Sequence, residues 1–370
     1  MFQIDTMSTT LDRQEIREAE LLPIMRELIE HHRRTCAPYA RILDAIGHSV
    51  DRKYEQLADL PWLPVRLFKE HRLVSTTSDE VAVLTSSGTT SSNVSRIALD
   101  RDAAELQRRA LTATLATLTG PRRLPMLIVD SPTAVREERF SIRGATVLGV
   151  MNIGRDHVFA FDKNNNIDAA AVENFLHRHG RESFLIFGFT SLVWTQFYSF
   201  AKSTGADLTH ARLLHTGGWK KLADQAVSPE AFRNGFRNAT GLSQCHNFYG
   251  MVEQGGVIHV ESASGDGLYC PAFTDVIIRD PHTWKEAATG TEGVIEVISA
   301  VPRAHPGHVL LTEDRGVVHG VDDGERPGKR FSVLGRLARA EPRGCADTLP
   351  AKLLETPPET RPETTFGLQP

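Results

Sequence analysis

Between residues 81 and 265, short apolar runs alternate with longer amphipathic stretches, and this alternation restricts the fold more than any other feature of the sequence. The apolar runs have the length of buried strands, and the amphipathic stretches 101–118 and 168–180 have the length of helices. Strands separated by such helices are typical of a parallel, doubly wound sheet. The sequence therefore predicts an α/β fold, with strands in residues 81–85, 124–130, 183–189 and 211–217.

Residues 1–80 are predicted to be a helical N-terminal segment of the same domain. Apolar side chains recur at roughly helical spacing from Leu11 to Ile29, directly after the hydroxyl residues Ser8–Thr10, which are common at helix starts. Pro23 lies inside this pattern. Because proline lacks an amide hydrogen, we expect two helices or a kink there.

Beyond residue 265 the helical pattern fades, and apolar strand-like runs alternate with turns. This pattern predicts a more antiparallel, β-rich subdomain that completes a core of residues 81–350. Residues 351–370 are rich in proline, threonine and glutamate, so we expect a disordered tail there.

Composition and charge exclude several classes of protein. Lys and Arg number 42 against 46 Asp and Glu, a net charge of −4, so no nucleic-acid partner is expected. The four cysteines lack the CxxC spacing of structural zinc sites. No apolar run approaches the ~18 residues of a membrane-spanning helix, and no membrane span is expected. The N-terminal sequence has no apolar signal core, so a cytoplasmic location is expected.

A segment rich in glycine and hydroxyl groups follows the first apolar run. Backbone amides and hydroxyls concentrated in one turn can hold phosphate oxygens, which need several short donors that approach closely. The segment matches neither the P-loop pattern nor GxGxxG. Its alternative interpretation is a serine- and threonine-rich surface turn. The residues that suggest phosphate binding are Ser86, Ser87, Gly88, Thr89 and Thr90.

Three later segments suggest the remaining parts of a nucleotide site. Glu253 follows a Tyr-Gly pair, and a carboxylate beside bound phosphates is what Mg²⁺ requires; the alternative is a glutamate on an exposed turn. Asp314 ends an apolar run and is suited to accept hydrogen bonds from ribose hydroxyls, although an ordinary Asp-x-Gly turn has the same pattern. The sequence TGGWK at 216–220 suits a wall for a purine base.

Taken in order, these segments resemble the adenylate-forming ligase superfamily. The order is SSGTTSS, TGGWK, YGMVEQ, PGHVLLTEDRG, GR and RGC. More narrowly, the chain is similar to the acyl-protein synthetase subunit of the bacterial luminescence fatty-acid reductase and its relatives, including the sequence PWLPVRLFK at 61–69. The resemblance spans about residues 60–346 and implies an adenylate-forming ligase core.

The resemblance implies ATP and Mg²⁺ as cofactors and a role for each motif. The hydroxyl-rich loop would hold the β- and γ-phosphates, and Glu253 would help to hold Mg²⁺. Asp314 would accept from the ribose hydroxyls with Arg336 beside it, and Cys345 would take the acyl group as a thioester. The residues that would lie near the adenine and the rest of the nucleotide are Gly217, Gly218, Trp219, Tyr249 and Gly250.

The sequence departs from the superfamily pattern in two places. The loop of the superfamily usually continues Thr-Gly-x-Pro-Lys, whereas this chain has Ser91 in place of the flexible glycine. Superfamily ligases also carry a C-terminal domain with a catalytic lysine after the motif that contains Arg336. Only 34 residues follow Arg336 in this chain, so that domain is expected to be reduced or absent. The narrower family is also short.

The implied reaction activates a carboxylic acid as its acyl-adenylate and then transfers the acyl group to a thiol. Arg339 and Arg343 precede Cys345 closely, and nearby cations favour the nucleophilic thiolate. The alternative for Cys345 is an inert, semi-buried cysteine. The other cysteines, Cys36, Cys245 and Cys270, are expected to be structural.

Three functional hypotheses remain open at this point. The first is an acyl-protein synthetase that loads Cys345 and passes the acyl group to a partner such as an acyl reductase. The second is a ligase that transfers it to coenzyme A or a carrier-protein thiol. The third is a non-catalytic adaptor that retains the fold.

The acid itself is not specified beyond a fatty or aromatic class. Aromatic residues in the segment 184–196 suggest apolar pocket walls, with the protein core as their alternative. His246 is interpreted either as part of the acyl pocket or as a packed or surface histidine.

Overall fold

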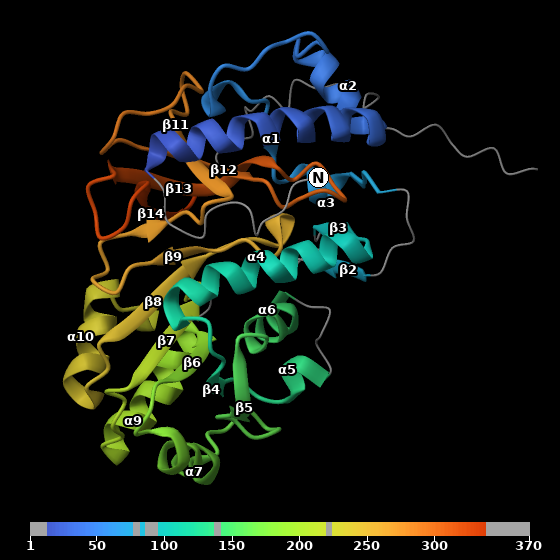
Figure 1. The fold of residues 1–370 in the computed structure, drawn as a ribbon. Helices are drawn as coiled ribbons and strands as arrows, with labels where there is room; N and C mark the ends of the chain where they lie inside the picture. Colours follow the sequence, from blue (N-terminus) through green and yellow to red (C-terminus); the bar gives the residue numbers. More distant parts are fainter. Residues whose placement is uncertain (1–12, 77–81, 86–94, 137–141, 220–223, 338–370) are drawn as a thin grey trace, which may run out of the picture.

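The computed structural model describes residues 13–76, 82–85, 95–136, 142–219 and 224–337. Most strands in these ranges form one twelve-stranded sheet, in the order β11-β12-β13-β14-β10-β9-β8-β7-β6-β4-β5, with β1 paired to β13. One half of this sheet is parallel and the other antiparallel. Figure 1 shows the two halves one above the other, with α4 lying where they meet.

The parallel half confirms the predicted doubly wound architecture. All of its neighbouring strands run in the same direction. Side chains of β4 alternate between two hydrophobic clusters, so that Met126 and Ile128 pack toward α4 and α6, and Leu127 and Val129 pack toward α7, α9 and α10. Helices thus cover both faces. The strands are β4 (Leu124–Val129), β5 (Gly154–Phe159), β6 (Phe184–Phe189), β7 (Ala211–Thr216) and β8 (Gln244–Tyr249).

The first helix of this half, α4, precedes β4, and the others lie between its strands in the sequence. The N-cap of α4 is Asp100, whose carboxylate accepts from the amide of Ala103, and Asp168 caps α7 in the same way. The helices are α4 (Arg101–Thr119), α5 (Thr133–Arg136), α6 (Ile142–Met151), α7 (Ala169–His179), α8 (Thr190–Leu192), the π-helix η3 (Val193–Tyr198), α9 (Ser199–Thr204) and α10 (Pro229–Thr240).

The antiparallel half confirms the β-rich region expected beyond residue 265. It is continuous with the parallel half, because β9 pairs with β8 in antiparallel register. One long strand, β13, runs through both sides of Asp314 in this half. The strands are β9 (His259–Glu261), β10 (Leu268–Tyr269), β11 (Thr274–Arg279), β12 (Glu292–Ser299), β13 (Val309–Val321) and β14 (Lys329–Arg336).

The predicted strand at 81–85 does not join the parallel sheet. Instead, β2 (Ala82–Thr85) pairs in antiparallel register with β3 (Arg96–Leu99) in a separate two-stranded sheet. Parallel neighbours need a long crossover connection, whereas antiparallel neighbours can be joined by a short one. The segment between 85 and 96 contains no helix-length amphipathic pattern, so antiparallel pairing is the arrangement available to it.

The N-terminal segment is helical as predicted, but Pro23 does not divide its first helix. Helix α1 runs from Gln14 to Thr35 through Pro23, and Leu21 and Met25 on either side of it are fully buried. Tertiary packing of this face offsets the lost amide hydrogen bond. The segment also contains α2 (Ala37–Ala45), the 3-10 helix η2 (Leu57–Asp59), β1 (Leu63–Pro64) and α3 (Leu67–Glu70).

Helix α1 packs on the antiparallel half of the sheet, in a hydrophobic cluster that it shares with β11, β12 and β13 (Figure 1). Strand β1 adds to this half by pairing with β13. The segment around 61–69 is thereby fixed beside the strand that carries Asp314. No helix in the described ranges is long and apolar enough to cross a membrane.

Candidate active site

Tyr249, Asp314 and Arg336 come together from three different strands. The Tyr249 hydroxyl donates to Oδ2 of Asp314 at 2.7 Å, and Arg336 Nε lies 3.8 Å from Oδ1 of the same carboxylate. Asp314 and Arg336 are register partners across β13 and β14. Burial, reinforced by the Asp314 charge, raises the pKa of Tyr249 well above its usual value, so the hydroxyl stays protonated as a donor. The Asp314 side chain is 19% exposed and the Arg336 side chain 77% exposed.

Glu253 lies in the short 3-10 helix η5 (Val252–Gln254) that follows β8. Its side chain is buried, with 5% exposed, which excludes the alternative of a glutamate on an exposed turn. Burial raises the pKa of Glu253, while a hydrogen bond with Ser95 and the positive charge of Lys69 oppose the rise. Lys69 itself forms an ion pair of 3.3 Å with Glu313. Glu253 is therefore a carboxylate whose charge is only partly compensated.

Glycines shape the turn that carries Glu253. A Cβ at Gly250 would lie 2.8 Å from the carbonyl oxygen of Val257, and a Cβ at Gly256 would lie 2.3 Å from that of Gln107. Gly256 also has a φ of +78°, which side-chain-bearing residues rarely adopt. The chain therefore passes too close to its neighbours for larger residues at these positions.

Gly217, Gly218 and Trp219 follow β7 directly, at the carboxyl edge of the parallel strands. The Thr216 hydroxyl donates to the Phe248 carbonyl at 2.8 Å, which fixes the end of β7 beside the end of β8. Gly217 has a φ of +84°, so the chain turns there in a conformation that favours glycine. Both glycines are exposed and Trp219 is half-buried. This edge of an α/β sheet is where ligands commonly bind.

Two predicted parts of the site lie outside the described residues. They are the loop residues Ser86, Ser87, Gly88, Thr89 and Thr90, and the cysteine Cys345. The first described residue after the loop, Ser95, is fully buried and bonds with Glu253. Ser95 is thereby held next to Glu253.

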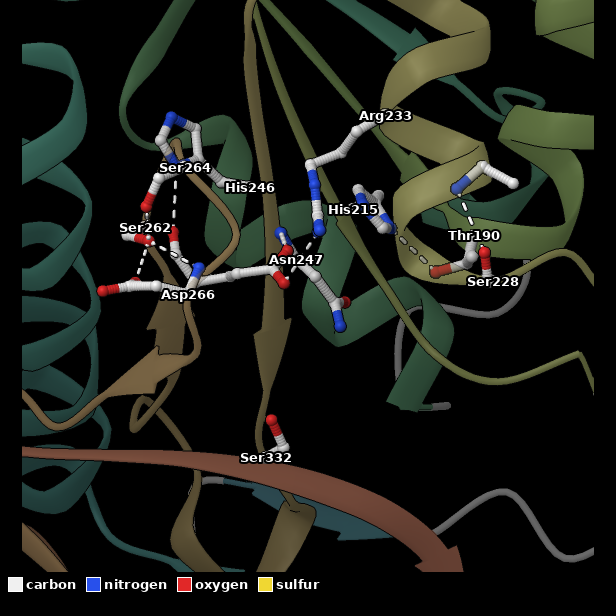
Figure 2. Close-up of polar contacts among 12 residues, drawn as sticks. Thr190, His215, Ser228, Arg233, His246, Asn247, Ser262, Ser264, Asp266 and Ser332 are labelled. Carbon is white, nitrogen blue, oxygen red and sulfur yellow. Dashed lines mark hydrogen bonds and ion pairs between the residues drawn. The ribbon is translucent and has the colours of Figure 1, made fainter. Parts of the chain in front are cut away.

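A row of polar residues that the sequence motifs do not indicate crosses β7, β8 and β9. His215 pairs in register with Asn247 of β8, and Asn247 N donates to Oε2 of Glu261 in β9 at 3.3 Å. Arg233 reaches from α10 and bonds with Glu261 at 3.0 Å. Figure 2 shows Arg233 beside Asn247, with His215 pointing toward Thr190. The residues belong to no local motif, and their only signal was polar character within apolar strands.

His215 is buried and neutral in this row. Its Nδ1 lies 2.9 Å from the Thr190 hydroxyl, and its ring stacks on Phe232 at 4.5 Å. Burial lowers the pKa of His215 to about 3, and the charge of nearby Arg233 contributes to the shift. His215 and Thr190 are therefore uncharged polar groups that lie beside an aromatic cluster, which includes Trp194.

Several residues left open by the sequence are buried. His246 is 3% exposed and its Nδ1 donates to the Glu261 carbonyl at 2.9 Å, which excludes the alternative of a surface histidine. Phe184 and Phe187 are core residues. The three described cysteines are buried free thiols, as expected for structural ones. Burial raises the pKa of Cys245 and Cys270 to about 12 and also raises that of Cys36.

Comparison of the chain with known proteins identifies a matching family. The model of the family described as "Acyl-protein synthetase, LuxE" matches residues 2–354. A long-chain-fatty-acid–luciferin-component ligase from Vibrio harveyi is 22% identical over 334 residues, which are 87% of this chain and 85% of that protein.

Among solved structures, the fold is similar to 2-hydroxyisobutyryl-CoA ligase. The open conformation, in complex with 2-HIB-AMP and CoA, has a TM-score of 0.67 at 15% identity and covers 91% of this chain and 79% of that one. A postadenylation state has a TM-score of 0.64 at 14% identity, with 91% and 72% covered. The fold is thus that of the adenylate-forming ligases, as the motif order predicted.

Proposed function

This chain belongs to the acyl-protein synthetase (LuxE) family and is a ligase that activates a carboxylic acid as its acyl-adenylate and transfers the acyl group, and we propose that Cys345 carries this group as a thioester. The observation that most supports the nucleotide site of this ligase is the hydrogen bond of 2.7 Å between Tyr249 and Asp314, close to the turn that carries the buried Glu253. Motifs far apart in the sequence thus supply one site.

The first half-reaction needs positioning and charge stabilisation rather than covalent help from the protein. A carboxylate oxygen attacks the α-phosphorus of ATP, an acyl-adenylate forms, and pyrophosphate leaves with the bonding electron pair. In this proposal Asp314 accepts from the ribose hydroxyls, Tyr249 holds the Asp314 carboxylate in place, and Arg336 lies beside it. The loop residues Ser86–Thr90 hold the β- and γ-phosphates.

Glu253 suits a Mg²⁺ ligand on chemical grounds. No group of three or more metal-ligating side chains is found in the described part of the chain. Mg²⁺ usually needs only one or two carboxylates together with substrate phosphates. A buried carboxylate with a raised pKa and only partial compensation is stabilised by a cation. Bound there, Mg²⁺ would neutralise charge on the phosphates.

In the second half-reaction, the Cys345 thiolate attacks the acyl carbon. A thioester forms, and AMP leaves with the electron pair of its former bond to the acyl carbon. Arg339 and Arg343 favour the thiolate. The acyl group then passes to a partner, for which we propose an acyl reductase. The alternatives remain a direct transfer to coenzyme A or a carrier-protein thiol, and an adaptor without activity.

We propose a fatty or aromatic acid as substrate and the cytoplasm as location. The aromatic cluster of Trp194, Tyr198, Phe232 and Phe236 near the carboxyl edge of β7 supports an apolar acid. The name of the Vibrio harveyi relative, which specifies a long-chain fatty acid, supports the same class.

The proposal is tested by intact-protein mass spectrometry after incubation with ATP, Mg²⁺ and a panel of aliphatic and aromatic acids. We expect wild type to gain a hydroxylamine-labile acyl adduct and to release pyrophosphate, and Cys345→Ala to release pyrophosphate without the adduct. The adduct mass identifies the acid. Pyrophosphate release by wild type without an adduct would favour transfer to a free thiol, and the absence of both would favour the adaptor.

A further inference from the structure

His305 holds the backbone of the turn that carries Glu253. It lies in the connection between β12 and β13, is 1% exposed, and its Nε2 donates to the carbonyl oxygen of Glu253 at 2.8 Å. The carbonyl can only accept, so the hydrogen is assigned to Nε2. The ring is held edge-on against Phe68 of α3, with the centroids 5.7 Å apart.

Residues next to Glu253 and His305 also hold the two segments together. The side-chain amide of Gln254 donates to the carbonyl of Gly307 at 2.9 Å and to that of Val297 at 3.3 Å. A Cβ at Gly307 would lie 2.6 Å from the carbonyl oxygen of Glu253. The 305–307 connection therefore lies directly against the Glu253 carbonyl, and side chains from both segments bond to carbonyl oxygens of the other.

We propose that His305 is a positioning residue, which fixes the Glu253 carboxylate for the bound nucleotide and its cation by holding the Glu253 carbonyl. This inference rests on the cation-binding role proposed for Glu253. The hydrogen bond has a function beyond packing, because an apolar side chain of similar size would fill the space and leave the buried carbonyl without its donor. His305 itself touches no reacting atom in this proposal.

The test is direct cation binding. Mn²⁺ would be titrated in the presence of α,β-methylene-ATP and followed by electron paramagnetic resonance, alongside the Mg²⁺ dependence of pyrophosphate release. Removal of groups that orient a metal ligand typically weakens metal binding 10- to 100-fold. We expect His305→Leu and His305→Asn, which lack a donor at the Nε2 position, to weaken Mn²⁺ binding about 10-fold. His305→Gln, whose amide can reach that position, should restore it.

The matched control is His308→Leu. His308 is equally buried in the same connection, but its Nε2 lies 3.3 Å from the Tyr39 hydroxyl and makes no contact with Glu253. This variant should lose thermal stability and bind Mn²⁺ as wild type does. If His305→Leu fails to fold, the pair His305→Asn and His305→Gln carries the test.

The outcomes separate this inference from the function on which it rests. Weaker Mn²⁺ binding in Glu253→Gln together with unchanged binding in His305→Leu and His305→Asn overturns the positioning role alone. Equal losses in His305→Gln and His305→Asn also overturn it, because rescue by the donor would be missing. Unchanged binding in Glu253→Gln overturns the proposed role of Glu253 itself.

Discussion

At the scale of single residues, the hydrogen bond between Tyr249 and Asp314 gives the most direct test of the nucleotide site. Tyr249→Phe removes a 2.7 Å bond to a carboxylate while keeping the ring. Bonds to charged groups contribute roughly 1.5–3 kcal/mol, and about 1.4 kcal/mol corresponds to a tenfold change in affinity. We therefore expect the Kd for ATP, measured by isothermal titration calorimetry, to rise about tenfold.

The chain offers a matched control for this change. The Tyr269 hydroxyl donates to Asp266 at the same distance of 2.7 Å, in a contact that includes none of the predicted site residues. Tyr269→Phe should leave ATP binding unchanged. A similar loss of affinity in both variants would show that Tyr249 acts only through stability.

Some of the residues of the candidate site could be predicted from the sequence, and others could not. Tyr249, Glu253 and Asp314 were identified because each lies in a recognisable local motif. His305 and Glu261 were not, because their contacts join positions 52 and 28 residues apart in the chain. Such contacts are created by folding, and neither residue type nor local spacing predicts them.

At the scale of elements, the ion pair between Arg233 and Glu261 fastens α10 to β9. The exposed fractions of the two side chains are 15% and 12%, so removal of one partner leaves a charge that is largely buried. Loss of one partner of such a pair costs about 3 kcal/mol or more. We expect Arg233→Met to lower the free energy of unfolding by about 3 kcal/mol in urea denaturation.

A double-mutant cycle separates this pair from general packing. Glu261→Gln in the Arg233→Met background removes the uncompensated charge and should recover part of the lost stability. If the two single losses simply add, the ion pair is not the connection that holds α10.

Helices and strands were predicted correctly where the hydrophobic period of the sequence matches the face that is buried in the fold. Strands β4, β6 and β7 and helices α4 and α7 follow the sequence pattern closely, because their buried faces repeat with the period of the element. The division into two helices that was one of the outcomes expected at Pro23 is not found, and β2 does not join the parallel sheet. Burial of Leu21 and Met25 outweighed the proline signal, and strand pairing depends on a partner that the local sequence does not specify.

At the scale of the whole molecule, the antiparallel and parallel halves share one sheet, and the residues of the candidate site come from both halves. Tyr249 ends a parallel strand, whereas Asp314 and Arg336 belong to antiparallel strands. The sequence predicted both halves but not their continuity. The β8–β9 pairing that joins them follows from the turn that carries Glu253, where Gly250 and Gly256 permit close contacts of the backbone.

Buried neutral histidines in several parts of the fold make the stability of the whole molecule sensitive to acid. Burial lowers the pKa of His215 and His308 to about 3 and that of His259 to about 4. In the unfolded chain these groups titrate near 6.5, so below that pH the unfolded state binds more protons than the folded state. The free energy of unfolding should therefore fall as the pH falls from about 6.5 toward 4, by up to about 1.4 kcal/mol per pH unit for each histidine.

Buried carboxylates act in the opposite direction over part of this range. Burial raises the pKa of Glu253 and Glu296, so the folded state binds protons before the unfolded state does, and their contribution to stability grows as the pH falls. Urea denaturation between pH 7.5 and 5 measures the net slope. Burial likewise raises the pKa of Glu261, whereas it lowers the pKa of His305 to about 4 and that of His32 well below its usual value. Because the buried histidines outnumber these carboxylates, we expect stability to fall with acid, and His308→Gln to reduce the slope because it removes one group that takes up a proton on unfolding. A stability that is constant or rises toward pH 5 would contradict the neutral burial of these histidines.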